Sequence, residues 1–120
     1  MSKTILIVDD CTALRQVARM ALEKAGYAVQ EAADGREALQ RLDLTQPHLI
    51  VCDLHMPVMD GLGLLKALAD RRGAVPPVVM LSTDTAPEPQ RQATALGAKA
   101  WLSKPFRPLH LVQAAERFSA

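Results

Sequence analysis

Aromatic side chains are scarce in this sequence, since one Trp, one Tyr and two Phe make up 3% of its 120 residues. A core of stacked rings is therefore excluded, and Leu, Val, Ile, Ala and Met must fill the interior. The composition, 49% hydrophobic and 22% charged, is typical of a folded chain and not of a disordered one. The length suits one domain, and we expect residues 1–120 to form it.

Excess charge, cysteine and long apolar runs are also lacking. A formal net charge of +1 argues against the basic surface that nucleic-acid or membrane binding requires. Cys11 and Cys52 fit neither a disulfide framework nor a zinc site, so both are predicted to be small buried groups in a reducing cytosol. The apolar run at residues 5–8 is too short for a signal peptide or a membrane span. We therefore expect a soluble, cytoplasmic protein.

Short apolar runs predict five buried strands, at residues 4–8, 27–32, 48–52, 77–81 and 98–103. The segments between them have the three- and four-residue spacing of helices. Thr12 is of a type favoured at helix N-caps, and Gly26 is a typical stop signal. The other helices are predicted at residues 35–44, at residues 61–72, from 88 or 89 to 97, and around Val112, Ala115 and Phe118.

Strand and helix thus alternate five times along the sequence. This alternation predicts an α/β fold in which helices cover both faces of a five-stranded parallel sheet. Runs that are apolar throughout are typical of strands buried on both faces. In such doubly wound folds, ligands bind outside the carboxyl ends of the strands.

Polar residues follow the predicted strands at these ends. Asp9 and Asp10 follow the first strand, and Asp53 follows the third. If the two strands are neighbours, three carboxylates converge and repel one another unless a cation such as Mg²⁺ offsets them. Ser82 ends the fourth strand and Lys104 follows the fifth. Each residue alone has an ordinary explanation as a turn or cap, but together they predict a site for a metal and a phosphoryl group.

Several motifs in order resemble the receiver domain of two-component response regulators, the family that includes CheY. The resemblance covers essentially the whole chain, and it implies a flavodoxin-like (βα)5 fold with strand order 2-1-3-4-5. The matching segments are IVDD at 7–10, DLHMPVMDG at 53–61, LS at 81–82 and KPF at 104–106, with DGREAL at 34–39 and LGAKAW at 96–101 in support.

The resemblance implies how the acidic residues act. Asp53 is expected to accept a phosphoryl group from a phosphohistidine of a sensor histidine kinase. Asp10, Asp53 and the backbone carbonyl of His55 are expected to hold Mg²⁺, with Asp9 acting directly or through a water. The side chain of His55 is expected either to border the site or to point into solvent.

The resemblance also implies a switch at the other strand ends. Ser82 and Lys104 are expected to contact phosphoryl oxygens, and the peptide between Lys104 and Pro105 is expected to be cis. Trp101 stands where the family usually carries an aromatic switch residue. A change in its rotamer is expected to alter the surface formed by the fourth helix, fifth strand and fifth helix.

We expect no output domain after residue 120, so that the domain signals through its own surface. AKAWLSKPF at 98–106 and RPLHL at 107–111 resemble the chemotaxis branch of single-domain receivers. The expected protein is a monomer and not an ordinary enzyme, although it assists its own phosphorylation and dephosphorylation. When phosphorylated, it is expected to bind a flagellar motor switch component.

Other functions remain open. Within the same class, the chain could be a stand-alone phosphate sink or relay receiver. An aspartate-nucleophile phosphatase of the dehalogenase type would need Asp-x-Asp-x-[Thr/Val] after the first strand, and DDCTA at 9–13 does not supply it. A flavodoxin-like cofactor binder would need a phosphate loop rich in Gly, Ser and Thr, where this chain has acids.

Overall fold

The computed structural model describes residues 2–71 and 73–119, so positions 1 and 120 of the expected domain lie outside it. Within these residues, five strands and five helices alternate. The strands are β1 (Thr4–Val8), β2 (Ala28–Ala32), β3 (Leu49–Asp53), β4 (Val78–Ser82) and β5 (Ala100–Ser103). The helices are α1 (Thr12–Lys24), α2 (Gly35–Leu44), α3 (Gly61–Ala69), α4 (Pro87–Ala95) and α5 (Pro108–Phe118). Of the described helices, none combines the length and the apolar character needed to cross a membrane.

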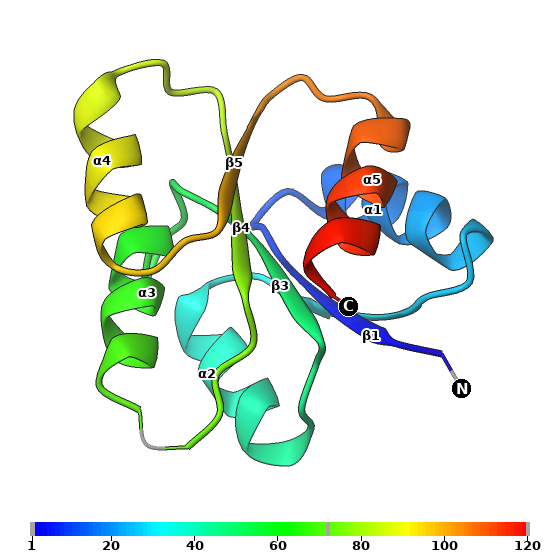
Figure 1. The fold of residues 1–120 in the computed structure, drawn as a ribbon, viewed down its shortest axis with the longest axis horizontal. Coiled ribbons are helices and arrows are strands. Elements are labelled where there is room, and N and C mark those ends of the chain that lie inside the picture. The colour runs from blue at the N-terminus through cyan, green and yellow to red at the C-terminus, as the bar shows by residue number, and fades with distance from the viewer. Residues whose placement is uncertain (1, 72, 120) are drawn as a thin grey trace.

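The strands form a parallel sheet in the order β2-β1-β3-β4-β5, which confirms the predicted fold and strand order. Figure 1 shows α1 and α5 together on one face of the sheet and α2, α3 and α4 on the other. The strand order reverses direction between β1 and β3. The carboxyl ends of these neighbouring strands therefore open onto the crevice where doubly wound folds bind ligands.

The central strands are buried on both faces. Every residue of β3 and β4 is buried, as their continuous apolar runs predict. Side chains alternate between two core clusters: Ile50 and Cys52 pack with α2, α3 and α4, whereas Leu49 and Val51 pack with α1 and α5. The strand ends are thus held from both sides, which gives polar residues placed there little freedom to move.

Several local predictions were wrong. Thr12 is the first residue of α1, and the N-cap is Cys11, which makes no side-chain cap bond. Cys11 is also exposed and not buried. Helix α3 ends at Ala69 and not at residue 72, a position that lies outside the described residues. Helix α4 begins at Pro87, earlier than expected, because proline fits the first helical position without losing a hydrogen bond.

The loop between β3 and α3 turns back tightly against the strand. Gly61 donates its N–H to the carbonyl of Leu54 over 2.9 Å, and the Asp60 side chain caps α3 by accepting from Gly63 N at 2.7 Å. A Cβ atom at Gly61 would lie 2.5 Å from the carbonyl oxygen of Asp53. Only glycine therefore lets the start of α3 approach the end of β3 this closely.

We predict that Gly61→Ala lowers the free energy of unfolding by about 1–3 kcal/mol, since the added methyl meets backbone atoms that cannot move aside easily. The control is Gly63→Ala, where the nearest atom to the new Cβ is Met59 Cγ at 3.1 Å, part of a flexible side chain. Urea unfolding of both variants checks this. Equal midpoints for the two variants would contradict it.

Candidate functional site

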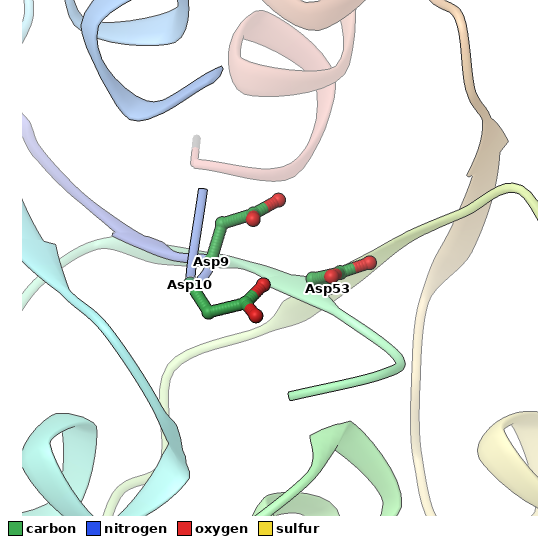
Figure 2. A group of neighbouring side chains, drawn as sticks. All are labelled: Asp9, Asp10 and Asp53. Carbon is green, nitrogen blue, oxygen red and sulfur yellow. The ribbon is translucent and has the colours of Figure 1, made fainter. Parts of the chain in front are cut away.

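Three carboxylates gather where β1 and β3 end. One oxygen from each of Asp9, Asp10 and Asp53 lies within 4.8 Å of the others, and Figure 2 shows the side chains turned toward a common space. Asp9 and Asp53 are buried, whereas Asp10 is exposed. The predicted convergence of the acidic residues is therefore confirmed, and this cluster could hold a metal ion.

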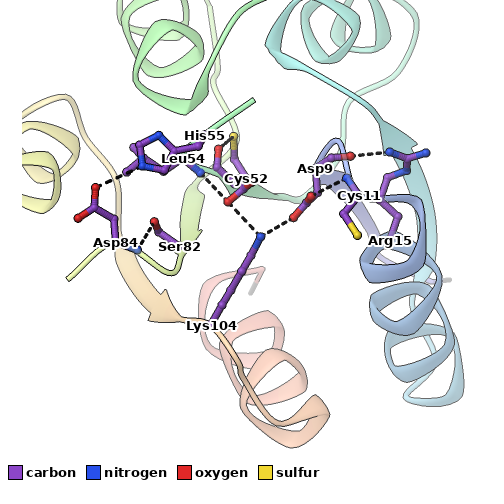
Figure 3. Close-up of polar contacts among 10 residues, drawn as sticks. Asp9, Cys11, Arg15, Cys52, Leu54, His55, Ser82, Asp84 and Lys104 are labelled. Carbon is purple, nitrogen blue, oxygen red and sulfur yellow. Dashed lines mark hydrogen bonds and ion pairs between the residues drawn. The ribbon is translucent and has the colours of Figure 1, made fainter. Parts of the chain in front are cut away.

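Lys104 reaches the acidic cluster from the end of β5. Its Nζ lies 2.9 Å from Asp9 Oδ2 and 3.1 Å from Asp53 Oδ1, so one ammonium group bridges the two buried acids (Figure 3). The peptide between Lys104 and Pro105 is cis, as expected. Among the described residues, Lys104 is the one cation paired with these three carboxylates, so the ionised cluster keeps a negative excess.

The environment shifts the pKa values of the bridged pair. Burial raises the pKa of Asp53 and the nearby charge of Asp9 adds to this, while the hydrogen bond from Lys104 opposes it. Burial also disfavours the charged form of Lys104, but the carboxylates of Asp9 and Asp53 outweigh that effect and raise its pKa. The lysine is therefore an ammonium at neutral pH, and an added cation would relieve the remaining repulsion.

The two oxygens of Asp53 have different surroundings. Oδ1 accepts the backbone N–H of Leu54 at 3.0 Å and pairs with Lys104. Among the described residues, none forms a hydrogen bond with Oδ2. Both side-chain oxygens of Asp9 are in use, because Oδ1 accepts Cys11 N–H at 2.9 Å and Oδ2 pairs with Lys104. Asp53 thus has one oxygen held by two partners and one without a hydrogen-bond partner among the described residues.

Ser82 lies at the same end of the sheet and is buried. Its Oγ accepts the backbone N–H of Asp84 at 2.9 Å. This bond leaves the hydroxyl proton of Ser82 available for another acceptor. The backbone N–H of Lys104 donates to the Ser82 carbonyl at 2.8 Å. Within the described part of the chain, the Ser82 hydroxyl makes no hydrogen bond to the Asp53 carboxylate or the Lys104 ammonium, so it lies at the edge of the site outside the charged cluster.

The side chain of His55 is 66% exposed, and its Nε2 lies 3.2 Å from Asp84 Oδ2. The contact joins the loop after β3 to the loop after β4. Asp84 also accepts the N–H of Ala86 at 2.9 Å, and these two bonds lower its pKa. The ring of His55 is therefore largely exposed to solvent, and its one side-chain contact among the described residues is with Asp84. A metal-binding role for the His55 carbonyl stays a prediction.

Trp101 lies in β5, where it pairs with Met80 of β4. Its ring is partly buried against the core cluster that includes Met80 and Ala93, on the α4 side of the sheet. Trp101 thus lies three residues before Lys104, with its ring packed on the side of the sheet that α4 covers.

Arg15 and Asp84 contact site residues, and the sequence reasoning missed both. Arg15 donates to the backbone carbonyl of Asp9 from the first turn of α1. Asp84 donates its backbone N–H to Ser82 Oγ, and its carboxylate contacts the His55 ring. The spacing Ser-x-Asp after a predicted strand could have indicated the turn at Asp84. The role of Arg15 had no local signal, because its partner is a main-chain atom.

Comparison with known families places these features in context. The profile of the response regulator receiver domain matches residues 5–116. The chain is 32% identical to the chemotaxis protein CheY of Thermotoga maritima, and the match covers 99% of each chain. The solved structure of the chemotaxis response regulator CheY4 of Vibrio cholerae superimposes with a TM-score of 0.90 at 39% identity, covering 98% of this chain and 99% of that one.

Longer proteins also match. The alkaline phosphatase synthesis transcriptional regulatory protein PhoP of Bacillus subtilis is 35% identical over 90% of this chain, which corresponds to 45% of PhoP. The chain therefore spans about half the length of the first curated relatives it matches.

We predict that Lys104→Met destabilises the fold on the order of 3 kcal/mol at neutral pH, because two buried carboxylates lose their shared cation. The loss should shrink in acid, where Asp53 becomes protonated. At the alkaline end, the folded-state pKa of Lys104 is raised above 10.5. Its contribution is therefore complete below pH 10.5 and is lost as the pH rises through the folded-state pKa.

Urea unfolding at several pH values in metal-free buffer checks this prediction. Lys99→Met is the control, since Lys99 is exposed and forms no ion pair with the described residues. Equal loss of stability in the two variants, or a loss at Lys104 that does not change with pH, would show that the bridge contributes nothing.

Proposed function

Because this chain belongs to the response regulator receiver domain family, we propose that it is the phosphoacceptor of a two-component phosphorelay and that Asp53 takes the phosphoryl group. The observation that carries the proposal is the asymmetry of Asp53. Oδ1 is fixed by Leu54 N–H and Lys104, and Oδ2 is free of hydrogen bonds from the described residues. A nucleophile held in this way presents one oxygen in a defined direction.

Proteins of this family are phosphorylated by sensor histidine kinases, and we propose such a kinase as the donor. An Asp53 oxygen forms a bond to phosphorus as the bond from phosphorus to the histidine nitrogen breaks. The electron pair of that bond returns to the imidazole, and the product is an acyl phosphate on Asp53. Lys104 already lies 3.1 Å from Asp53, so its positive charge is in place to stabilise the added phosphoryl oxygens.

The acidic cluster fits Mg²⁺, which prefers carboxylate oxygens and keeps several waters. Ligands about 2.1 Å from one Mg²⁺ lie up to about 4.2 Å apart. One oxygen from each of the three acids lies within 4.8 Å of the others. Following the family resemblance, we assign direct ligation to Asp10, Asp53 and the His55 carbonyl. Both oxygens of Asp9 are occupied, so we assign it contact through a water. When bound, Mg²⁺ supplies positive charge that offsets the acids and stabilises the transferring group.

Ser82 and Lys104 complete the proposed site. The hydroxyl group of Ser82 can donate its proton to one phosphoryl oxygen, whether or not its Oγ still accepts the hydrogen bond from Asp84 N–H. Movement of Ser82 would open space near β5, where Trp101 packs between the sheet and α4. The proposed switch is a change in the Trp101 rotamer that alters the surface of α4, β5 and α5.

We further propose a chemotaxis role for residues 1–120 as one monomeric receiver domain. Support comes from the similarity, over nearly the full length of both chains, to proteins named as chemotaxis regulators. The proposed output is binding of the α4, β5 and α5 surface to a flagellar motor switch component. A phosphate sink or relay receiver is the rival, and it would bind no such component in its phosphorylated form. As a receiver domain, the chain is a signalling domain and not a conventional enzyme.

We predict that Asp53→Asn folds but accepts no phosphoryl group from acetyl phosphate, since the amide lacks the nucleophilic oxygen. Mass spectrometry should detect an alkali-labile adduct on the parent and on Asp43→Asn, an exposed control on α2. The same yield of alkali-labile adduct on Asp53→Asn as on the parent would reject Asp53 as the acceptor.

Trp101 gives a second test, because it is the only tryptophan in the sequence. Moving the proposed switch from 1:99 to 99:1 requires about 5.5 kcal/mol. Two charge-assisted hydrogen bonds, from Ser82 and Lys104, at ~1.5–3 kcal/mol each supply most of this. We predict that Mg²⁺ with beryllofluoride changes the Trp101 emission or its access to a quencher, and that Ser82→Ala weakens the change.

Asp53→Asn should abolish this response. If emission and quenching stay the same while the beryllofluoride adduct is seen directly by fluorine NMR, Trp101 packs in one rotamer and is not the switch.

A further inference from the structure

Arg15 connects the first helix to the end of β1. Its Nη1 donates to the backbone carbonyl oxygen of Asp9, and its side chain is only 16% exposed. Figure 3 shows the guanidinium beside Asp9, on the side away from Lys104. Arg15 thus contacts the acidic cluster through the main chain and not through a carboxylate.

Glu31 of β2 anchors this guanidinium. Its Oε1 accepts from Arg15 Nε at 3.0 Å, and its Oε2 accepts from Arg19 Nε at 2.8 Å. Burial disfavours the charged carboxylate, but the hydrogen bonds from Arg19 and Arg15 outweigh it and lower the pKa of Glu31. Register pairs Glu31 with Ile7, two residues before Asp9. The network therefore ties α1, β2 and the end of β1 together.

With the contact from Arg15, every polar atom of Asp9 has a hydrogen-bond or ion-pair partner. Its N–H donates to the Ala32 carbonyl at 3.0 Å, its side-chain oxygens contact Cys11 and Lys104, and its carbonyl accepts from Arg15. By contrast, Asp10 is exposed, and its side chain makes no hydrogen bond or ion pair with the described residues.

The Asp9 carbonyl belongs to the planar peptide that leads into Asp10. Because the peptide is planar, a hydrogen bond at its oxygen restrains the whole group, including the nitrogen of Asp10, and so restricts where the Asp10 carboxylate lies. We propose that Arg15 is a positioning residue for divalent cations: by holding this peptide it keeps Asp10 turned toward Asp53. The inference rests on the metal site of the proposed function, which it extends beyond the ligands themselves.

Charge alone predicts the opposite effect. A guanidinium near the acids repels an incoming cation, so removal of its charge should tighten cation binding. Removal of a residue that orients a ligand should weaken binding, by about tenfold for groups that hold metal ligands in place. The sign of the change in affinity therefore separates the two effects.

The test is Mg²⁺ binding to the unphosphorylated chain, measured by titration calorimetry, together with urea unfolding without metal. Arg15→Met should weaken Mg²⁺ binding about tenfold. Arg15→Lys keeps the charge but replaces the planar fork, in which Nε contacts Glu31 and Nη1 contacts the Asp9 carbonyl, with a single nitrogen, so it should also weaken binding. The control is Arg19→Met, which removes a partner of Glu31 that makes no hydrogen bond to Asp9, and its affinity should stay within about twofold of the parent.

Asp10→Asn, which removes a proposed ligand, sets the scale of a lost contact. If the parent itself binds no Mg²⁺, the metal site of the proposed function fails, and this inference fails with it. If the parent binds but Arg15→Met binds equally or more tightly, only the positioning role is overturned. Where Arg15→Met does not fold, the affinity of Arg15→Lys relative to the parent decides the question. A loss of unfolding free energy without a change in affinity would assign Arg15 to stability alone.

Discussion

The ammonium group of Lys104, placed between two buried carboxylates, is the interaction on which the rest of the site depends. Asp9 and Asp53 lie at the ends of neighbouring parallel strands, so the sheet brings them together although their negative charges repel. Without an internal cation, the fold would have to protonate one of them or lose stability. Lys104 comes from the edge strand β5 and extends past β4 to reach both acids. The Lys104 side chain thereby reduces the repulsion between the two buried carboxylates, while the three-acid cluster keeps a net negative charge.

Rigid surroundings keep this arrangement in place. The strands that carry Asp9 and Asp53 are buried on both faces, and the start of α3 contacts the end of β3 where Gly61 lacks a side chain. Hydrogen bonds to the main chain then fix the directions of the acids, through Leu54 N–H at Asp53 and through Arg15 at Asp9. The orientation of these acids therefore depends on hydrogen bonds to the backbone, and such bonds cannot be predicted from side-chain motifs.

Periodicity and residue order were enough to predict the alternating elements, and they predicted the convergence of the acids on the condition that the first and third strands are neighbours. The strand order came from resemblance, since nothing local in the sequence specifies it. Contacts between distant elements could not be predicted: the bridge from Lys104 to Asp9, the bond from Arg15 to a carbonyl, and the pairing of His55 with Asp84. Each depends on how helices and loops approach the sheet. The predicted burial of Cys11 was wrong for the same reason. Cys11 lies at the start of α1 and is exposed, and composition does not indicate which way a residue at a helix start faces.

The proposed phosphorylation changes the charge that Lys104 must balance. A phosphoryl group carries about two negative charges at neutral pH, where the carboxylate carried one. The lysine, already shared with Asp9, would be drawn further toward Asp53, and the hydroxyl proton of Ser82 is the next donor along the sheet edge. Ser82 is held by the N–H of Asp84, whose side chain meets His55. In the proposed mechanism, a shift of Ser82 would therefore move the loop that leads into α4. Hydrogen bonds at the strand ends would then connect the proposed acceptor to the surface.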